Sequence, residues 1–247
     1  MSTLLLILLS LQAHATSVDR FAAGDAAFRT RHDEQNARRA LQLYRESYKH
    51  DPGDAAAAWR VSMACYFNGL RFKADSEKKR ALFNEGRNAG LAGVALEENC
   101  APCHFWGAIN MALYGNEVGA VKMLFALSDL RAHLHRSIEI DPAYAFGGAY
   151  RLLGLIEQKL PGILGGNNQR ARAYFEKAIA VAPDEPLNYL FMAKLLHDEL
   201  GDKRGAHEFA RRGKDLSTPA SERLESIEAQ AELQTLFSAE GEQLGQR

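Results

Sequence analysis

Side chains able to do chemistry are concentrated in one short segment of the chain, Cys100-Ala101-Pro102-Cys103-His104. In the pattern Cys-x-x-Cys-His, two thiols bond the vinyl groups of a haem and the adjacent histidine binds its iron. Two other states suit the same residues: a disulfide between Cys100 and Cys103 in an oxidising compartment, or two free buried thiols. A thioredoxin-like redox role is disfavoured, because that motif follows a β-strand and this sequence has no strand pattern. The disulfide, the free thiols and the covalent haem remain as alternatives.

The other candidates for chemistry do not form a catalytic or metal-binding pattern. His133 and His135 lie two residues apart, which points them to different faces of a helix and disfavours a shared metal ion. The stretch from Gly162 to Asn168 is rich in glycine, but it has no Lys, Ser or Thr to hold a phosphate and its metal. The signatures of zinc proteases, serine hydrolases and P-loop proteins are also missing. We therefore expect a protein that is not an enzyme and binds no metal, with haem as the alternative cofactor.

The elements that position these side chains are marked by a repeated spacing. Ala40, Tyr44, Ser47 and Pro52 recur as Ala171, Phe175, Ala178 and Pro183, and Leu130, Leu134, Ser137 and Pro142 form a weaker copy. The first three positions of each set share one face of a helix, and the proline ends that helix. The prolines fall at intervals of roughly 40 to 45 residues, with one missing near Glu98, and this range is typical of stacked helix pairs. The sequence predicts an all-α solenoid of about four to five antiparallel helix pairs, whose concave surface does the binding.

One predicted helix, from Tyr144 to Lys159, contains an isolated charge. Arg151 lies between Tyr150 and Leu152 in a stretch that is otherwise apolar or rich in glycine. A buried guanidinium needs a carboxylate partner or a ligand, so Arg151 forms either an internal ion pair or part of a binding site. Glycines such as Gly154 in the same helix predict a close approach of a neighbouring helix, because each costs helix stability without a packing reason.

The composition allows one elongated domain or two compact ones, and the repeat favours one. The formal net charge of -1 offers no broad attraction for nucleic acid or for an anionic membrane. The run from Leu4 to Leu11 is apolar, too short to span a bilayer, and followed by the cleavage-site pattern Ala13-His14-Ala15. We expect a signal peptide over residues 1–15, a helical-repeat domain over 16–238 and a frayed tail over 239–247. The mature chain is expected in the periplasm without a membrane span, and without a lipid because no cysteine lies near the cleavage site.

A further set of short motifs resembles one family. In chain order they are His104-Phe105-Trp106, Asn110, Leu113-Tyr114-Gly115, Asp141-Pro142, Gly147-Gly148, Tyr150-Arg151, Gly154 and Leu160-Pro161-Gly162-Ile163-Leu164-Gly165-Gly166. Over roughly residues 40–215 they are similar to the tetratricopeptide-repeat T component of TRAP (tripartite ATP-independent periplasmic) transporters. The resemblance implies a tetratricopeptide-like periplasmic protein that can self-associate, has an apolar channel or groove for a small apolar ligand, and docks a periplasmic solute-binding protein.

The candidate site follows from this resemblance and from the isolated arginine. The candidate ligand or partner contacts are His104, Trp106, Asn110, Tyr114, Tyr150 and Arg151. They would face the groove from the inner helices of adjacent repeats, whereas Trp106 and Tyr114 could equally belong to the core. We expect a binding protein that acts as an accessory to TRAP-type solute uptake. The alternatives are a periplasmic c-type haem protein built on Cys100, Cys103 and His104, and a generic peptide-binding scaffold.

Overall fold

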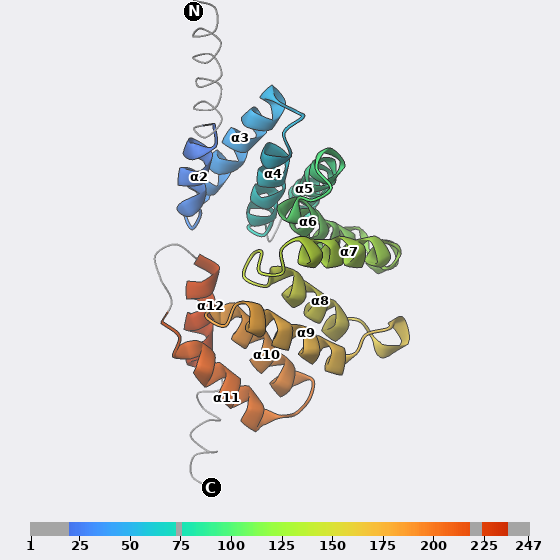
Figure 1. The fold of residues 1–247 in the computed structure, drawn as a ribbon, viewed down its shortest axis with the longest axis vertical. Coiled ribbons are helices and arrows are strands. Elements are labelled where there is room, and N and C mark those ends of the chain that lie inside the picture. The colour runs from blue at the N-terminus through green and yellow to red at the C-terminus, as the bar shows by residue number, and fades with distance from the viewer. Residues whose placement is uncertain (1–19, 73–75, 218–223, 237–247) are drawn as a thin grey trace, which may run out of the picture. The chain divides into compact units, whose positions relative to one another are not determined.

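The computed structural model describes residues 20–72, 76–217 and 224–236, and every element in these ranges is helical (Figure 1). The helices are α2 (Ala22–Arg29), α3 (Glu34–His50), α4 (Ala55–Gly69), α5 (Ser76–Leu96), α6 (Ala101–Val118), α7 (Ala120–Ile140), α8 (Gly148–Lys159), the 3-10 helix η1 (Gly162–Leu164), α9 (Asn168–Val181), α10 (Pro186–Asp198), α11 (Lys203–Lys214) and α12 (Leu224–Thr235). The all-α prediction is confirmed. The expected signal peptide, residues 1–15, and the expected tail, 239–247, lie outside the described residues. Within the described ranges, none of the helices is both long enough and apolar enough to cross a membrane.

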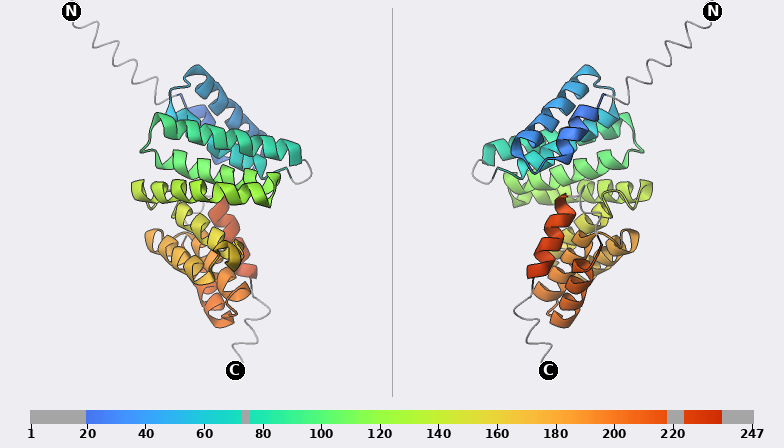
Figure 2. Two further views of the ribbon diagram at one scale, coloured as in Figure 1. Left: turned by 90° about the vertical axis from the view of Figure 1, so that its right-hand side faces the viewer. Right: turned by 90° about the vertical axis from the view of Figure 1, so that its left-hand side faces the viewer.

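The chain divides into two compact units, and the boundary lies inside α7 between Leu130 and Arg131. In the first unit, α4 packs against α3, α5 and α6. In the second unit, α10 packs against α9, α11 and α12. Figure 2 shows the helices of each unit lying side by side. The repeat pattern therefore continues through two units, and the expected domain over residues 16–238 stays a prediction.

The repeated spacing describes how the second helix of a pair packs on the first. Tyr44, Phe175 and Leu134, which occupy the same position in the three copies, are all fully buried. A glycine on the first helix receives the ring in each of three pairs: Gly24 with Tyr44, Gly69 with Phe83 and Gly154 with Phe175. A Cβ at any of these glycines would overlap the ring. The packing reason expected for Gly154 is therefore present, and Phe83 packs on Gly69 of α4 as Tyr44 packs on Gly24 of α2.

Helices α5 and α6 approach each other through a line of small residues. Gly86, Gly90 and Gly93 of α5 face Asn110, Gly107 and Cys103 of α6, in opposite chain order, so the two helices are antiparallel. A Cβ on Gly90 would overlap the Gly107 Cα. Because both groups belong to the backbone, no side-chain rotation could relieve that contact. This crossing brings the start of α6, with its two cysteines, against α5.

The start of α8 differs from the prediction. The sequence predicted a helix from Tyr144, but α8 begins at Gly148. Ala145, Phe146 and Gly147 have φ values of 50, 56 and 77°, which lie in the left-handed region. L-residues rarely adopt this conformation, so Ala145 and Phe146 are strained and interrupt the right-handed helix.

Candidate functional site

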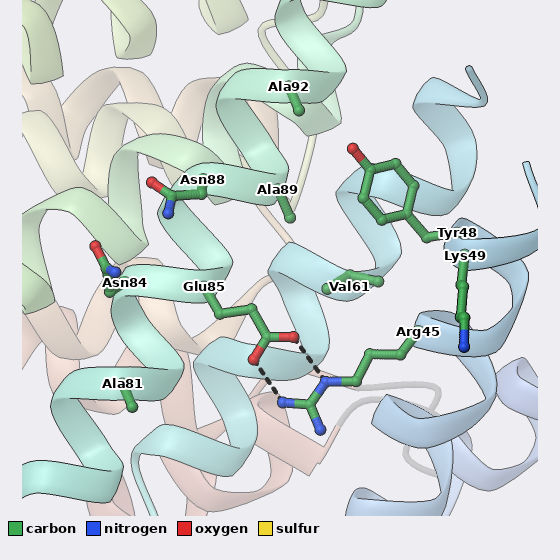
Figure 3. A pocket seen from close by; sticks show the side chains of 10 residues that line it. All are labelled: Arg45, Tyr48, Lys49, Val61, Ala81, Asn84, Glu85, Asn88, Ala89 and Ala92. Carbon is green, nitrogen blue, oxygen red and sulfur yellow. Dashed lines mark hydrogen bonds and ion pairs between the residues drawn. The ribbon is translucent and has the colours of Figure 1, made fainter. Parts of the chain in front are cut away.

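A groove lies in the first unit between α3 and α5, with α4 beneath it (Figure 3). Its volume is about 600 Å³, within the range of ligand-binding pockets. The residues that line it are Arg45, Tyr48, Lys49, Val61, Ala81, Asn84, Glu85, Asn88, Ala89 and Ala92. The α5 side is built from alanine and asparagine, so the groove has a shallow apolar wall with amide groups beside it. It can take up part of another molecule by burying apolar surface and by hydrogen bonding to the amides.

An ion pair crosses one end of this groove. Figure 3 shows Arg45 reaching from α3 to Glu85 on α5, with two parallel hydrogen bonds: Nε donates to Oε1 at 2.6 Å and Nη2 donates to Oε2 at 2.5 Å. The hydrogen bonds to Glu85 raise the pKa of the Arg45 guanidinium. Both side chains are more than a third exposed. A pair this exposed contributes no more than about 1 kcal/mol, so a bound molecule could replace it at little cost.

Cys65 lies on α4 close to this ion pair and is completely buried. Burial raises the pKa of its thiol well above the ordinary value, and the Glu85 carboxylate adds to the rise. The thiol therefore stays protonated and unreactive in the folded protein. Cys65 is therefore a small core residue of the first unit.

The two cysteines at the start of α6 are joined by a disulfide. The Cα atoms of Cys100 and Cys103 are 5.3 Å apart, and both side chains pack in an apolar cluster with Ala55, Trp59 and Val94. The neighbouring His104 is buried, and its Nε2 donates to the Glu98 carbonyl oxygen at 2.9 Å. A haem would need both sulfurs at its edge and this ring nitrogen on its iron. As they lie here, these residues do not fit a covalent haem.

Two other candidates on α6, Trp106 and Asn110, lie in the core of the first unit. Trp106 packs against Tyr66, Phe67 and Phe105, with ring centroids 4.8 to 5.8 Å apart. The Nδ2 of Asn110 donates to the carbonyl oxygens of Ser62 and Trp106, each at 2.9 Å. Asn110 is 0% exposed, so these contacts hold helices together and do not form a surface. His104, Trp106 and Asn110 are thus buried in this structure, which agrees with the core alternative for Trp106, and a role of these residues in binding stays a prediction.

Tyr114, the last candidate on α6, is half-buried. The guanidinium of Arg87 from α5 stacks over its ring, with the Arg87 Cζ 4.7 Å from the ring centroid. This cation–π contact is at the surface and contributes about 0.5 to 1 kcal/mol. Tyr114 is thus more accessible than the other three, and its role in binding stays a prediction.

In the second unit, Arg151 supports the strained turn before α8. Its Nη1 donates to the Phe146 carbonyl oxygen at 2.5 Å and to the Asn188 Oδ1 at 2.6 Å, and its Nη2 donates to the Ala145 carbonyl oxygen at 2.9 Å. Asn188, on α10, is fully buried and also donates to the Phe146 carbonyl oxygen. The guanidinium therefore stabilises the left-handed residues. This structural role was not foreseen from the sequence. The neighbouring candidate, Tyr150, is half-buried, and its role in binding stays a prediction.

Comparison with known proteins gives the family. The model for regulator of microtubule dynamics protein 1-3 matches residues 21–240, which is most of the chain. The chain belongs to this family. The matched family differs from the transporter component that the sequence motifs resemble. Both the match and the resemblance agree with a tetratricopeptide-like fold. No curated protein matches this chain in sequence.

Solved structures show the fold of this family member. A thermophilic tetratricopeptide-repeat protein of Thermus thermophilus is similar with a TM-score of 0.65 and 16% identity, over 88% of this chain and 98% of that one. PilF of Pseudomonas aeruginosa is 18% identical over 90% of this chain and 93% of its own, with a TM-score of 0.48 that is too low to support an argument. The first likeness shows a tetratricopeptide-type helical repeat.

The groove between α3 and α5 was not predicted from the sequence. Arg45, Glu85 and Ala92 come from two helices that are not consecutive, so no local motif joins them. One signal was available: Ala81, Asn88 and Ala92 recur at helical spacing and place short side chains on one face of α5. The described residues hold no group of three or more His, Cys, Asp or Glu arranged for a metal ion.

Proposed function

We propose that this protein is a binding scaffold that holds a segment of a partner protein in the groove between α3 and α5. The observation that supports this is the composition of the groove. Ala92, with the mostly buried Val61 and Ala89, lines the groove with apolar atoms. Asn84 and Asn88 provide amides that can pair with the backbone of an extended or helical segment. Its opposed charges, Arg45 and Glu85, satisfy each other, which favours binding over catalysis.

The class of partner follows from the expected location. The apolar run and cleavage pattern before Thr16 support export, and the disulfide between Cys100 and Cys103 suits an oxidising compartment. Together with the motif resemblance, these features support an accessory role in TRAP-type uptake, with a periplasmic solute-binding protein as partner. A small apolar ligand of the kind that the resemblance implies could also enter the groove.

The family supplies a second candidate function. Its description, regulator of microtubule dynamics, makes tubulin the alternative partner, and the match over residues 21–240 favours it. A scaffold of this fold could hold a tubulin segment in the same groove. The two candidates differ in compartment, so identifying the partner separates them.

The test is photo-crosslinking from inside the groove in the native host. A photoreactive residue replaces Asn88, which lines the groove, and in the control it replaces Gln42, an exposed α3 residue that does not line it. We expect a partner protein to crosslink at position 88 only, and Ala92→Trp to abolish the product because the indole fills the groove. Ala95→Trp, at an exposed position of α5 that does not line the groove, should leave the product intact.

The identity of the crosslinked protein decides between the candidates. A solute-binding protein supports the accessory role, and tubulin supports the role in the family description. A product at position 88 that survives Ala92→Trp, or equal labelling from positions 88 and 42, would contradict binding in the groove.

A further inference from the structure

The loop between α8 and α9 presents an apolar tip to solvent. Ile163 is 94% exposed and Leu164 is 44% exposed, and Pro161 beside them is also exposed. Figure 1 shows this loop, in yellow, projecting beyond the ends of the two helices. Consecutive exposed apolar residues are unfavourable in water and mark an interaction site when they are ordered.

The tip is held in one conformation by hydrogen bonds at its base. Leu164 N donates to the Pro161 carbonyl oxygen at 2.8 Å, and Gly165 N donates to the Gly162 carbonyl oxygen at 2.9 Å. Gly166 N also donates to Pro161 O, at 3.1 Å. Gly165 has a φ of +89°, and a Cβ on Gly166 would overlap the Leu160 carbonyl oxygen, so this backbone requires both glycines. Ile163 is therefore exposed by a defined structure.

Charged groups below the tip reinforce this arrangement. The Glu157 side chain is 7% exposed and accepts from the Arg131 Nη2 and the Arg170 Nε, each at 2.8 Å. Arg170 also donates to the Gly165 carbonyl oxygen. Because these guanidinium groups are engaged with Glu157, the loop lacks the cluster of free cations that attracts a basic segment to an anionic membrane. A protein surface suits the tip better than a lipid surface.

The groove between α3 and α5 has the complementary chemistry. Figure 3 shows the Tyr48 ring and Val61 opposite Ala89 and Ala92, beyond the Arg45–Glu85 pair. Small alanine side chains leave room for branched aliphatic ones, and the volume of about 600 Å³ is large enough for more than one. A pre-organised aliphatic anchor in a pocket is the usual core of a protein interface.

We propose that the Pro161–Leu164 tip of one copy docks in the α3/α5 groove of a second copy of this chain. The proposal rests on the proposed function, since the groove must accept a protein segment, and it names one such segment. Tip and groove are different surfaces, so the contact is head-to-tail and each bound copy still offers a free tip or a free groove. Self-association then competes with a partner for the groove.

The experiment is sedimentation velocity of the full mature chain over a range of concentrations, with two interface variants. Ile163→Asp removes the tip and Ala92→Trp blocks the groove. Wild type should form dimers and larger species, and each variant alone should associate about 10- to 100-fold more weakly, the cost of losing one buried aliphatic side chain. Ile227→Asp, at an exposed site on α12, is the matched control and should behave as wild type.

Mixing the two variants gives the decisive result. A chain with a blocked groove still has its tip, and a chain without its tip still has its groove. An equimolar mixture should therefore form a heterodimer that grows no further. A wild-type chain that stays monomeric, or a mixture without heterodimer, would overturn the inference.

A membrane role is an alternative outcome of the same variants. If wild type stays monomeric but sediments with phosphatidylglycerol–phosphatidylcholine vesicles, and Ile163→Asp abolishes this, the tip binds lipid and the inference is wrong. Crosslinking of another protein from position 88 in a monomeric chain would refute self-association alone and leave the proposed function standing.

Discussion

At the scale of single residues, Arg151 shows how a functional candidate can have a structural role. Its fork of hydrogen-bond donors contacts two carbonyl oxygens of the left-handed turn and the amide oxygen of Asn188. The sequence indicated correctly that a charge in this apolar helix needs partners. It could not indicate that backbone carbonyls would be among them, because the left-handed conformation of Ala145 and Phe146 carries no residue signature.

We predict that Arg151→Lys lowers the free energy of unfolding by about 2 kcal/mol, because an ammonium cannot replace the planar set of hydrogen bonds. Adding Phe146→Gly should recover about 1 kcal/mol, since glycine adopts the positive φ without strain. Chemical denaturation measures both changes. Equal stability of wild type and Arg151→Lys would show that the turn does not depend on the guanidinium.

Tyr44 gives a prediction for pH dependence. Burial, and the hydrogen bond that its hydroxyl donates to the Asp25 Oδ1 at 2.7 Å, raise the pKa of Tyr44 far above its ordinary value of 10.0. In the unfolded chain this phenol ionises near its ordinary pKa, while the folded protein keeps the proton. The contribution to stability is complete below pH 10 and falls as the pH rises above it.

We expect the free energy of unfolding of wild type to fall more steeply above about pH 10 than that of Tyr44→Phe, by about 1.4 kcal/mol per pH unit. Urea denaturation between about pH 9 and pH 11 measures the two slopes. Parallel slopes for wild type and Tyr44→Phe would rule out this coupling.

At the scale of elements, the repeat spacing was the part of the fold that the sequence predicted best. Ala171, Phe175 and Ala178 are all completely buried, because a face of small and aromatic residues can pack on a neighbouring helix in only one orientation. The line of close contacts between α5 and α6 was not predicted. Glycine in a sequence shows where a close approach is permitted but does not identify the partner helix.

The α5–α6 contact can be tested at Gly90. Gly90→Ala places a Cβ against the Gly107 backbone, so the helices must separate, and we expect a loss of about 1 to 3 kcal/mol despite the better helix propensity of alanine. Thermal unfolding measures it as a lower Tm. Gly162→Ala, where a Cβ meets nothing within 4 Å, is the control and should leave Tm unchanged. If the two variants unfold alike, the close approach does not limit stability.

At the scale of the whole molecule, the sequence predicted the fold class but not the candidate groove. The candidates on α6 follow from the family resemblance, and such residues suit both a groove and a core; the structure buries His104, Trp106 and Asn110. The groove lies between α3 and α5, so finding it required knowing which helices are neighbours in space. Side-chain chemistry alone does not give that information.

Processing of the whole chain is tested by the intact mass of protein exported by a host that can attach haem. We expect a species that begins at Thr16, carries no haem, and gains about 2 Da on reduction as the Cys100–Cys103 disulfide opens. The same protein is measured with and without reductant, and these two samples form the matched pair. A haem-mass adduct would contradict the disulfide, and an uncleaved N-terminus would contradict export.

The position of the disulfide also bears on how the chain reaches its native state. Cys100 and Cys103 are only three residues apart, so their bond can form as soon as this short stretch is available to an oxidant, before distant helices have met. Neighbouring helices likewise make contacts that are mostly local in sequence, and such topologies fold rapidly. Cys65 is the one cysteine left out of the disulfide, and its burial on α4 protects it from a mispaired bond in the folded protein. Maturation of this protein should therefore need an oxidant but no disulfide isomerase.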